Sequence, residues 1–253
     1  IGFFDSISIE ISAMIFIILG SFPFIVYIKF LSGNNRIFFS DIQIRTFLKI
    51  ILFSIIFLSL YLILNSTTQL NLRAIFFNVI SILTGTGYVN AQFDSWGGFP
   101  LIIFLGLMFI GGCAGSTTCG IKIFRIQILY SFVLNQLKKI IYPKGIFILK
   151  YNQNPVDNKF IASIISFIYM YLVIFFIITA LLSLTGLDFI TSISGAATSI
   201  SNVGPGLGST IGPNGNFSSL PNISKWILSI GMILGRLELF AILVLFLPSF
   251  WRN

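Results

Sequence analysis

The stretch Ser81-Ile-Leu-Thr-Gly-Thr-Gly-Tyr88 decides the fold, because a short apolar segment runs there into alternating threonine and glycine. A stretch of the same kind, Thr198-Ser-Ile-Ser-Asn-Val-Gly-Pro205, begins 117 residues later. The half-apolar segments that lead into the two turns, 72–83 and 188–200, are shorter than the roughly 20 residues of a membrane-crossing helix. Their length is typical of a helix that enters a membrane and turns back.

The rest of the chain is strongly apolar. Of the 253 residues, 56% are hydrophobic and 9% are charged, whereas soluble domains carry about 25% charged residues. A soluble fold of this size cannot bury so much apolar surface, so the composition excludes a water-soluble enzyme and indicates an integral membrane protein. The chain has no His and only two Cys, Cys113 and Cys119. Imidazole acid–base chemistry and a disulfide framework are therefore excluded, and we interpret both cysteines as small packing residues.

Five apolar stretches are long enough to be spans. They are residues 7–31, 47–64, 99–128 (interrupted), 160–184 and 223–250. The basic residues between them gather on one side: Lys29, Arg36, Arg45, Lys49, Lys122, Arg125, Lys138, Lys139, Lys144, Lys150, Lys159 and Arg252. The other side carries only Arg73 and Lys225. This asymmetry predicts a multi-pass protein of the cytoplasmic (inner) membrane with a cytoplasmic C-terminus, in contact with membrane lipid. It does not predict binding of nucleic acid, because no basic soluble domain is present.

The two Gly-rich turns predict an ion path. A short helix that points into the membrane brings its carbonyl end, which favours a cation, near the bilayer centre. Glycine then permits backbone angles that turn carbonyl oxygens toward an axis, where they replace the hydration shell of a monovalent cation. The alternative is a pair of extracellular loops with ordinary glycine turns.

Two further features stand inside the apolar stretches. Gly-Gly-Cys-Ala-Gly-Ser-Thr-Thr-Cys-Gly (111–120) interrupts the third one, which favours a broken helix lining a cavity over a small-residue packing surface. Arg236 lies inside the fifth stretch, where a charge costs about 2.5–3.5 kcal/mol. It therefore faces either water or a partner from another part of the protein. Lys122 and Arg125, at the end of the third stretch, are expected to extend to the inner interface.

These motifs occur together in the order of a known family. They are Thr-Gly-Thr-Gly-Tyr (84–88), Phe-Ile-Gly-Gly-Cys-Ala-Gly-Ser-Thr-Thr-Cys-Gly-Ile-Lys (109–122), Ser-Asn-Val-Gly-Pro-Gly-Leu-Gly (201–208), Gly-Arg-Leu-Glu (235–238) and Pro-Ser-Phe-Trp-Arg (248–252). Over its whole length the chain resembles the Trk/Ktr potassium-uptake family, most closely the TrkH-type membrane subunits.

The resemblance implies an all-α polytopic membrane protein built from the helix–pore-loop–helix repeats of a potassium-channel-like pore. It also implies that the chain corresponds to the C-terminal half of such a subunit, with two complete repeats and the last helix of a preceding one. Residues 1–40 would be the second helix of repeat two and a cytoplasmic loop. Residues 41–158 would be repeat three, and residues 159–253 repeat four.

The resemblance implies a role for each motif in potassium uptake. Backbone carbonyls of two strands would bind potassium: Thr84, Gly85, Thr86, Gly87, Ser201, Asn202, Val203 and Gly204. An intramembrane gate loop would contain Gly111, Gly112, Ala114, Gly115, Ser116, Thr117 and Gly120. Arg236 would be an electrostatic barrier in the pore. Two departures stand out, since residues 201–204 lack the Thr-x-Gly pattern and Cys119 stands where the family often has glycine.

The implied partners are the N-terminal half of the same polypeptide, a second copy in a homodimer and a cytoplasmic nucleotide-binding regulatory subunit on residues 122–159. Potassium is expected as the substrate, and no cofactor bound by this chain is expected. The sequence itself argues against an enzyme, because its seven carboxylates are scattered and no nucleophile stands beside a base. An alternating-access cation transporter with broken helices remains the alternative.

Overall fold

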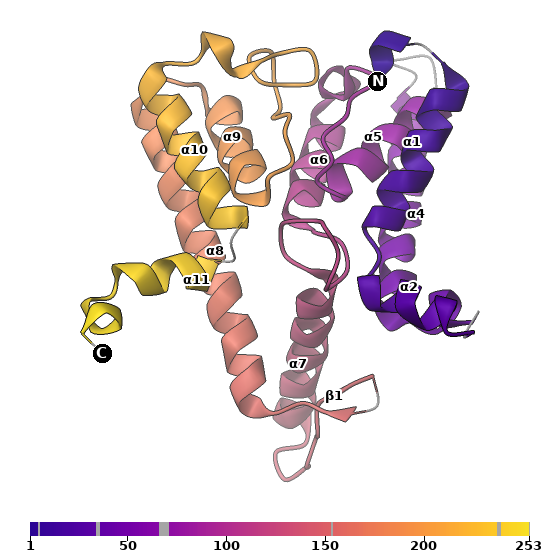
Figure 1. Cartoon of the computed structure of the whole chain (residues 1–253), viewed down its shortest axis with the longest axis vertical. Coiled ribbons are helices and arrows are strands. Elements are labelled where there is room, and N and C mark those ends of the chain that lie inside the picture. The colour runs from indigo at the N-terminus through magenta and orange to yellow at the C-terminus, as the bar shows by residue number, and fades with distance from the viewer. Residues whose placement is uncertain (5, 34–35, 66–70, 153, 237–238, 253) are drawn as a thin grey trace.

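The computed structural model describes residues 1–4, 6–33, 36–65, 71–152, 154–236 and 239–252. Over these residues the regular secondary structure is helical apart from one small hairpin (Figure 1). The helices are α1 (Ile7–Gly20), α2 (Phe24–Leu31), α3 (Ile37–Ser40), α4 (Ile42–Asn65), α5 (Leu72–Leu83), α6 (Gly98–Phe109), α7 (Ile123–Ile141), α8 (Asn158–Leu184), α9 (Phe189–Ser201), α10 (Asn222–Arg236) and α11 (Leu239–Leu243). Strands β1 (Lys150–Tyr151) and β2 (Asn154–Pro155) form the antiparallel hairpin.

Short 3₁₀ turns complete the described part of the chain. They are Gly2–Phe4, Phe93–Trp96, Phe217–Ser219, Val244–Phe246 and Pro248–Trp251.

Only some of the expected spans are straight helices. In the described part of the chain, α4 and α8 are each long and apolar enough to cross a membrane. The prediction of one continuous span over residues 7–31 is wrong, because α1 and α2 meet at an angle of 92°. Pro23 stands at this break, and a proline cannot donate the backbone hydrogen bond that would continue the helix.

The expected continuous span over residues 223–250 is also wrong. Helix α10 ends at Arg236, and the helical segment 239–246 leaves it at 111°. Residues 237–238, between the two, lie outside the described residues. In Figure 1 α11 points away from the bundle accordingly. The expected interruption of the third span is confirmed, since residues 110–122 separate α6 from α7 and are not helical.

The two short helices occur where the sequence predicts them. Helices α5 and α9 begin 117 residues apart, at Leu72 and Phe189. Each is capped by the side chain of the preceding residue: Asn71 accepts from the amide of Ala74 at 3.2 Å, and Asp188 accepts from the amide of Thr191 at 3.1 Å. Helix α5 packs against α1, α4 and α6, and α9 packs against α6, α8 and α10. The longer helices therefore surround two short ones that end inside the molecule.

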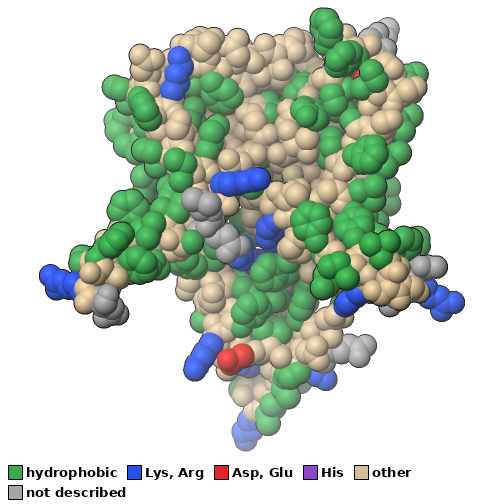
Figure 2. All heavy atoms as spheres, in the orientation of Figure 1, with side chains coloured by type: hydrophobic (Ala, Val, Ile, Leu, Met, Phe, Trp, Pro, Cys, Tyr) green, Lys and Arg blue, Asp and Glu red, His purple; other side chains and the backbone are tan. Residues whose placement is uncertain are grey.

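The surface agrees with a membrane environment. Large apolar side chains such as Phe16, Phe53, Phe176 and Trp226 are more than half exposed, and Figure 2 shows apolar side chains along both flanks. Lys and Arg side chains gather toward the end of the molecule that carries α7 and the hairpin (Figures 1 and 2). We call this end the basic end.

Candidate functional site

The two Gly-rich turns have matching backbone conformations. In the first turn φ is +70° at Gly85 and +73° at Gly87. In the second, 117 residues later, φ is +53° at Asn202 and +120° at Gly204. Left-handed residues that alternate with ordinary ones turn successive carbonyl groups toward one side of a strand, and glycine adopts this conformation without steric cost. Asn202 replaces glycine at one position, and asparagine is one of the few other residues that tolerate it.

The hydrogen bonds that hold the turns also repeat. In the first turn the amides of Gly85 and Thr86 donate to the carbonyls of Ile82 and Ser81, at 3.1 and 3.0 Å. In the second turn the amides of Asn202 and Val203 donate to the carbonyls of Ser199 and Thr198, at 3.2 and 3.0 Å. All four positions lie 117 residues after their equivalents in the first turn. The repeat that is weak in sequence is therefore strong in backbone geometry.

The turns lie against each other. A Cβ atom added to Gly87 would stand 2.0 Å from the carbonyl oxygen of Val203, and one added to Gly204 would stand 3.6 Å from the Cα of Gly87. The structure thus brings residues 84–87 and 201–204 together. At Gly87 it leaves no room for a side chain.

Side chains of the turns are held by the surrounding protein. The hydroxyl groups of Thr84 and Thr86 are 2.9 Å apart. Ser201 is buried, with its Oγ 2.6 Å from the hydroxyl oxygen of Tyr171 on α8. Asn202 donates through Nδ2 to the carbonyl of Met232 on α10 at 3.0 Å. The contacts of Ser201 and Asn202 hold the second turn against α8 and α10.

Residues 110–122 form a closed loop between α6 and α7. Its ends are joined by hydrogen bonds from the amide of Gly111 to Ile121 O and from the amide of Ile121 to Phe109 O, both at 2.9 Å. A Cβ at Gly111 would lie 2.0 Å from Cys119 O, and one at Gly112 would lie 2.7 Å from Thr118 Oγ1. Glycine is required at these positions because the loop folds tightly on itself.

The loop is tied to the break between α1 and α2. The amide of Cys113 donates to Ser21 O at 3.1 Å, and the amide of Phe24 donates to Gly115 O at 2.9 Å. Thr117 donates through Oγ1 to Gly20 O at 3.1 Å. Of the predicted loop residues, Gly111, Gly112, Ala114, Gly115, Ser116, Thr117 and Gly120 all lie in this one non-helical segment. The broken-helix interpretation of residues 111–120 is therefore confirmed.

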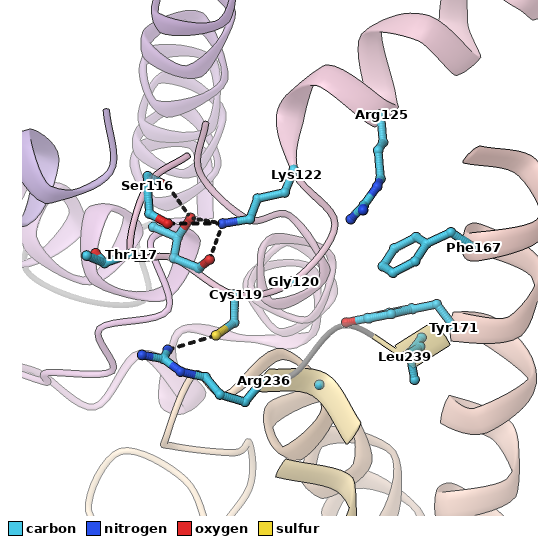
Figure 3. Close-up of a pocket in the computed structure, with 12 residues that line it drawn as sticks. Ser116, Thr117, Cys119, Gly120, Lys122, Arg125, Phe167, Tyr171, Arg236 and Leu239 are labelled. Carbon is cyan, nitrogen blue, oxygen red and sulfur yellow. Dashed lines mark hydrogen bonds between the residues drawn. The ribbon is translucent and has the colours of Figure 1, made fainter. Parts of the chain in front are cut away.

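Lys122 and Arg125, which the sequence predicts to extend to the inner interface, both contact other parts of the protein. Lys122 turns into the loop, where Nζ donates to the carbonyls of Ser116, at 3.4 Å, and Thr118 (Figure 3). The Arg125 guanidinium lies 3.8 Å from the centre of the Phe167 ring on α8, a cation–π contact. The sequence signal for these contacts is the nearness of both residues to the Gly-rich stretch.

Arg236 reaches the loop from the other side. As the last residue of α10 it donates through Nη1 to Cys119 Sγ at 2.9 Å (Figure 3). Cys119 is thus more than the packing residue expected from sequence, because it holds the one basic side chain at the end of α10. Leu237 and Glu238, of the Gly-Arg-Leu-Glu motif, lie outside the described residues.

Two cavities meet at this contact. One, of about 330 Å³, lies between the first turn and the loop, and is lined by Phe16, Ile17, Gly20, Ser21, Thr84, Gly85, Thr86, Tyr88, Thr117, Thr118, Cys119 and Arg236. The other, of about 300 Å³, is lined by Ser116, Thr117, Thr118, Cys119, Gly120, Lys122, Arg125, Phe167, Tyr171, Gly235, Arg236 and Leu239 (Figure 3). Cys119 and Arg236 line both cavities, so the loop and Arg236 stand between them.

Sequence reasoning missed one ion pair that is buried on its acidic side. Glu10 on α1 is 2% exposed, and its Oε2 lies 3.1 Å from Nε of Arg73, in the first turn of α5, whose side chain is one-third exposed. The contact joins α1 to the short helix. The sequence signal for this contact is Glu10 itself, an acidic residue inside the apolar stretch 7–31.

Within the described residues, no group of three or more His, Cys, Asp or Glu could hold a metal ion.

These features define a polytopic helical membrane protein in which two short helices turn back inside the fold above an intramembrane loop. The chain belongs to the TrkH family of cation transport proteins, whose family model matches residues 1–253. This family is one of transport proteins and not of enzymes.

Individual relatives agree. The Trk system potassium uptake protein TrkI of Halomonas elongata is 40% identical over 240 residues, covering 94% of this chain and 49% of the relative. TrkH of Escherichia coli K12 is 30% identical over the whole chain and 53% of its own length. The crystal structure of the potassium transporter TrkH from Vibrio parahaemolyticus matches with a TM-score of 0.92 at 28% identity, covering 99% of this chain and 54% of that one. The chain spans about half the length of the relatives it matches.

Proposed function

We propose that this chain supplies two filter strands and the gate of a potassium-uptake pore, as part of the pore-forming subunit of a Trk/Ktr-type system. The observation that carries the proposal is the matched pattern of left-handed residues, at 85 and 87 and again at 202 and 204, at the ends of two inward-pointing short helices. Relatives named as potassium uptake proteins support potassium as the ion.

The proposed filter works through backbone oxygens. Carbonyls of Thr84, Gly85, Thr86 and Gly87 on one side, and of Ser201, Asn202, Val203 and Gly204 on the other, replace the water around a potassium ion. The carbonyl ends of α5 and α9 add a field that favours a cation. Two strands cannot surround an ion, so the N-terminal half of the same polypeptide supplies the others. Potassium is the substrate, and no further cofactor takes part.

The proposed gate is the 110–122 loop together with Arg236. They separate the cavity below the first turn from the cavity toward the basic end. A fixed positive charge in such a narrow place lowers the local concentration of cations and sets how easily potassium passes. Movement of the loop away from Arg236 would join the two cavities.

The remaining assignments follow from this proposal. Residues 1–40 close a preceding repeat, residues 41–158 form the third repeat and residues 159–253 the fourth. The basic end and the C-terminus face the cytoplasm, following the positive-inside rule. A homodimer and a cytoplasmic nucleotide-binding subunit that docks on residues 122–159 complete the assembly.

The test is growth at limiting potassium of a bacterium without its own potassium-uptake systems. The complete polypeptide that contains this chain is expressed as wild type and as the Gly204→Ser variant. We expect the wild type to restore growth and the variant to restore it less well, with equal amounts of both in the membrane. Absence of rescue by membrane-inserted wild type, supplied with its cytoplasmic partner, would contradict the proposal.

A further inference from the structure

A glutamine in the first turn of α4 holds the middle of the 110–122 loop. Gln43 accepts through Oε1 a hydrogen bond of 2.8 Å from the amide of Ala114. The turn that carries Gln43 is itself fixed, because Asp41 Oδ1 accepts from the amides of Gln43 and Ile44 at 2.8 and 3.1 Å. The backbone of Gln43 is therefore held in place by Asp41, and its side chain reaches the loop.

The same turn of α4 is held by α7. Gln127 donates through Nε2 to Ile42 O at 3.1 Å and to Thr46 Oγ1 at 2.6 Å. Ile42 is the residue before Gln43, so a displacement of Gln127 acts directly on the backbone that positions Gln43. The loop also begins and ends on α6 and α7, but Gln43 and Gln127 form a second route, in which each step is a hydrogen bond made by a side chain.

A tyrosine in the hairpin completes the route. The hydroxyl of Tyr151 donates to Gln127 Oε1 at 3.1 Å. Burial raises the pKa of Tyr151 to about 12, so the side chain is a neutral donor at physiological pH. Buried Ile128, Leu149 and Ile161 pack beside it and attach the hairpin to α7 and α8. The turn at Asn152 and Asn154 remains exposed at the basic end.

We propose that Gln43 is a positioning residue of the 110–122 loop, and that Gln127 and Tyr151 join it to the hairpin, so that a partner that displaces the hairpin releases the loop. This inference rests on the proposed function, because it explains how a docked regulatory subunit would act on the gate. A series of hydrogen bonds can couple the hairpin to the loop only if the effects of breaking two of the bonds are not additive.

The contrast with the other loop contacts explains why these residues are chosen. Contacts to the α1–α2 break, such as the hydrogen bond from the amide of Cys113 to Ser21 O and that from Thr117 Oγ1 to Gly20 O, do not involve the hairpin. Loss of the Gln43 acceptor leaves the partly buried amide of Ala114 without its partner, and a buried donor in that state is unfavourable.

The experiment measures the exposure of Cys119 in membrane vesicles that contain the complete polypeptide. A small water-soluble thiol reagent is added from the cytoplasmic side, and peptide mapping separates labelled Cys119 from Cys113, which is buried. We expect Gln43→Leu, Gln127→Leu and Tyr151→Phe each to raise the labelling rate of Cys119 roughly fivefold, the factor expected for one lost hydrogen bond. The double variant Gln43→Leu/Tyr151→Phe should label no faster than the faster single variant.

Matched controls keep the result specific. Gln136→Leu and Tyr130→Phe change exposed residues of the same types on α7 and should leave the rate unchanged. Gln43→Glu retains an acceptor oxygen and should restore the wild-type rate, which a purely steric role of Gln43 would not explain. Tyr151→Phe keeps the ring in the hairpin core, so it remains informative if a glutamine variant fails to insert.

The outcomes separate this inference from the proposed function. Unchanged labelling in Gln43→Leu, or additive effects in the double variant, would overturn the coupling even if the vesicles take up potassium. The labelling pattern above would support the coupling even if wild-type vesicles take up no potassium, in which case the proposed function fails alone.

Discussion

The two short-helix turns are nearly identical in backbone, whereas the helices that follow them have little in common. The left-handed residues, the caps and two hydrogen bonds of each turn recur at a spacing of 117 residues. One bond differs, since the amide of Gly87 donates to Ser81 O and the amide of Gly204 donates to Thr198 Oγ1. After the first turn, α6 breaks at Phe109 into a loop tied at several points. After the second, α10 runs to Arg236 and ends beside that loop.

The difference separates two kinds of constraint. In the turns, backbone groups of two different sequences, Thr-Gly-Thr-Gly and Ser-Asn-Val-Gly, place left-handed residues at equivalent positions. After the turns, Cys119 and Arg236 occupy equivalent positions 117 residues apart, one in the loop and one at the end of α10, and their side chains meet. The turns therefore tolerate a change of sequence without a change of backbone pattern, whereas the two equivalent positions that follow carry different side chains in different local structures.

The largest effect is expected for Gly87→Ser. Its Cβ would stand 2.0 Å from Val203 O, and φ at this position is +73°, so the turn must deform. At Gly204 the nearest atom is 3.6 Å away and only the φ of +120° is unfavourable. We expect Gly87→Ser to abolish selective uptake, and Gly204→Ser to lower the ratio of potassium to sodium uptake by about tenfold, in line with a backbone strain of 1–3 kcal/mol.

The control for these variants is Gly106→Ser. Gly106 lies in α6, and an added Cβ meets nothing within 4 Å. Uptake measured with radioactive potassium and sodium should match the wild type. If Gly87→Ser and Gly204→Ser keep the wild-type ratio, the turns are not a filter.

Arg236 tests the part that does not repeat. Arg236→Gln removes a positive charge from the constriction between the cavities, and we expect cation flux to rise about tenfold, the size of a unit-charge effect at close range in a partly hydrated site. Arg236→Lys keeps the positive charge and loses the planar guanidinium group, so the cation flux through this variant should stay near that of the wild type. Loss of folding without a gain in flux, seen as poor membrane insertion, would instead favour a structural ion pair.

A reciprocal exchange compares the first left-handed position of each turn. Gly85→Asn should be tolerated, because a Cβ there comes no closer than 3.8 Å to Asn202 O and asparagine accepts a positive φ. Asn202→Gly loses the 3.0 Å hydrogen bond to Met232 O but relieves the left-handed strain. We expect thermal stability to change by less than about 1 kcal/mol in both. A loss as large as that of Gly87→Ser would show that the two turns are not interchangeable.

The sequence predicts the short helices, the turns and the broken third span because these depend on local signals. Residues 72–83 are too few to cross a membrane, and glycine residues mark the turn at 84–87 and the loop at 111–120. It did not predict the 92° bend, the inward course of Lys122 and Arg125 or the pair Glu10–Arg73. The bend lies at Pro23, and Lys122 contacts carbonyls of its own loop, whereas Arg125 and Glu10 contact residues far away in the chain. Apolar length and charge position carry no information about which of these partners a side chain contacts.

The smallest effect concerns the hairpin, which lies between the two units. Burial, with Asp41 nearby, raises the pKa of Tyr151 from 10.0 to about 12. The stabilisation of the hairpin by neutral Tyr151 is therefore complete below about pH 10 and is lost as pH rises through about 12. The difference in ultraviolet absorbance between wild type and Tyr151→Phe should show tyrosinate forming around pH 12, and the thermal stabilities of the two should converge there. A midpoint near pH 10 would mean that the ring is solvated, and the hairpin would then be too loosely held to move the loop.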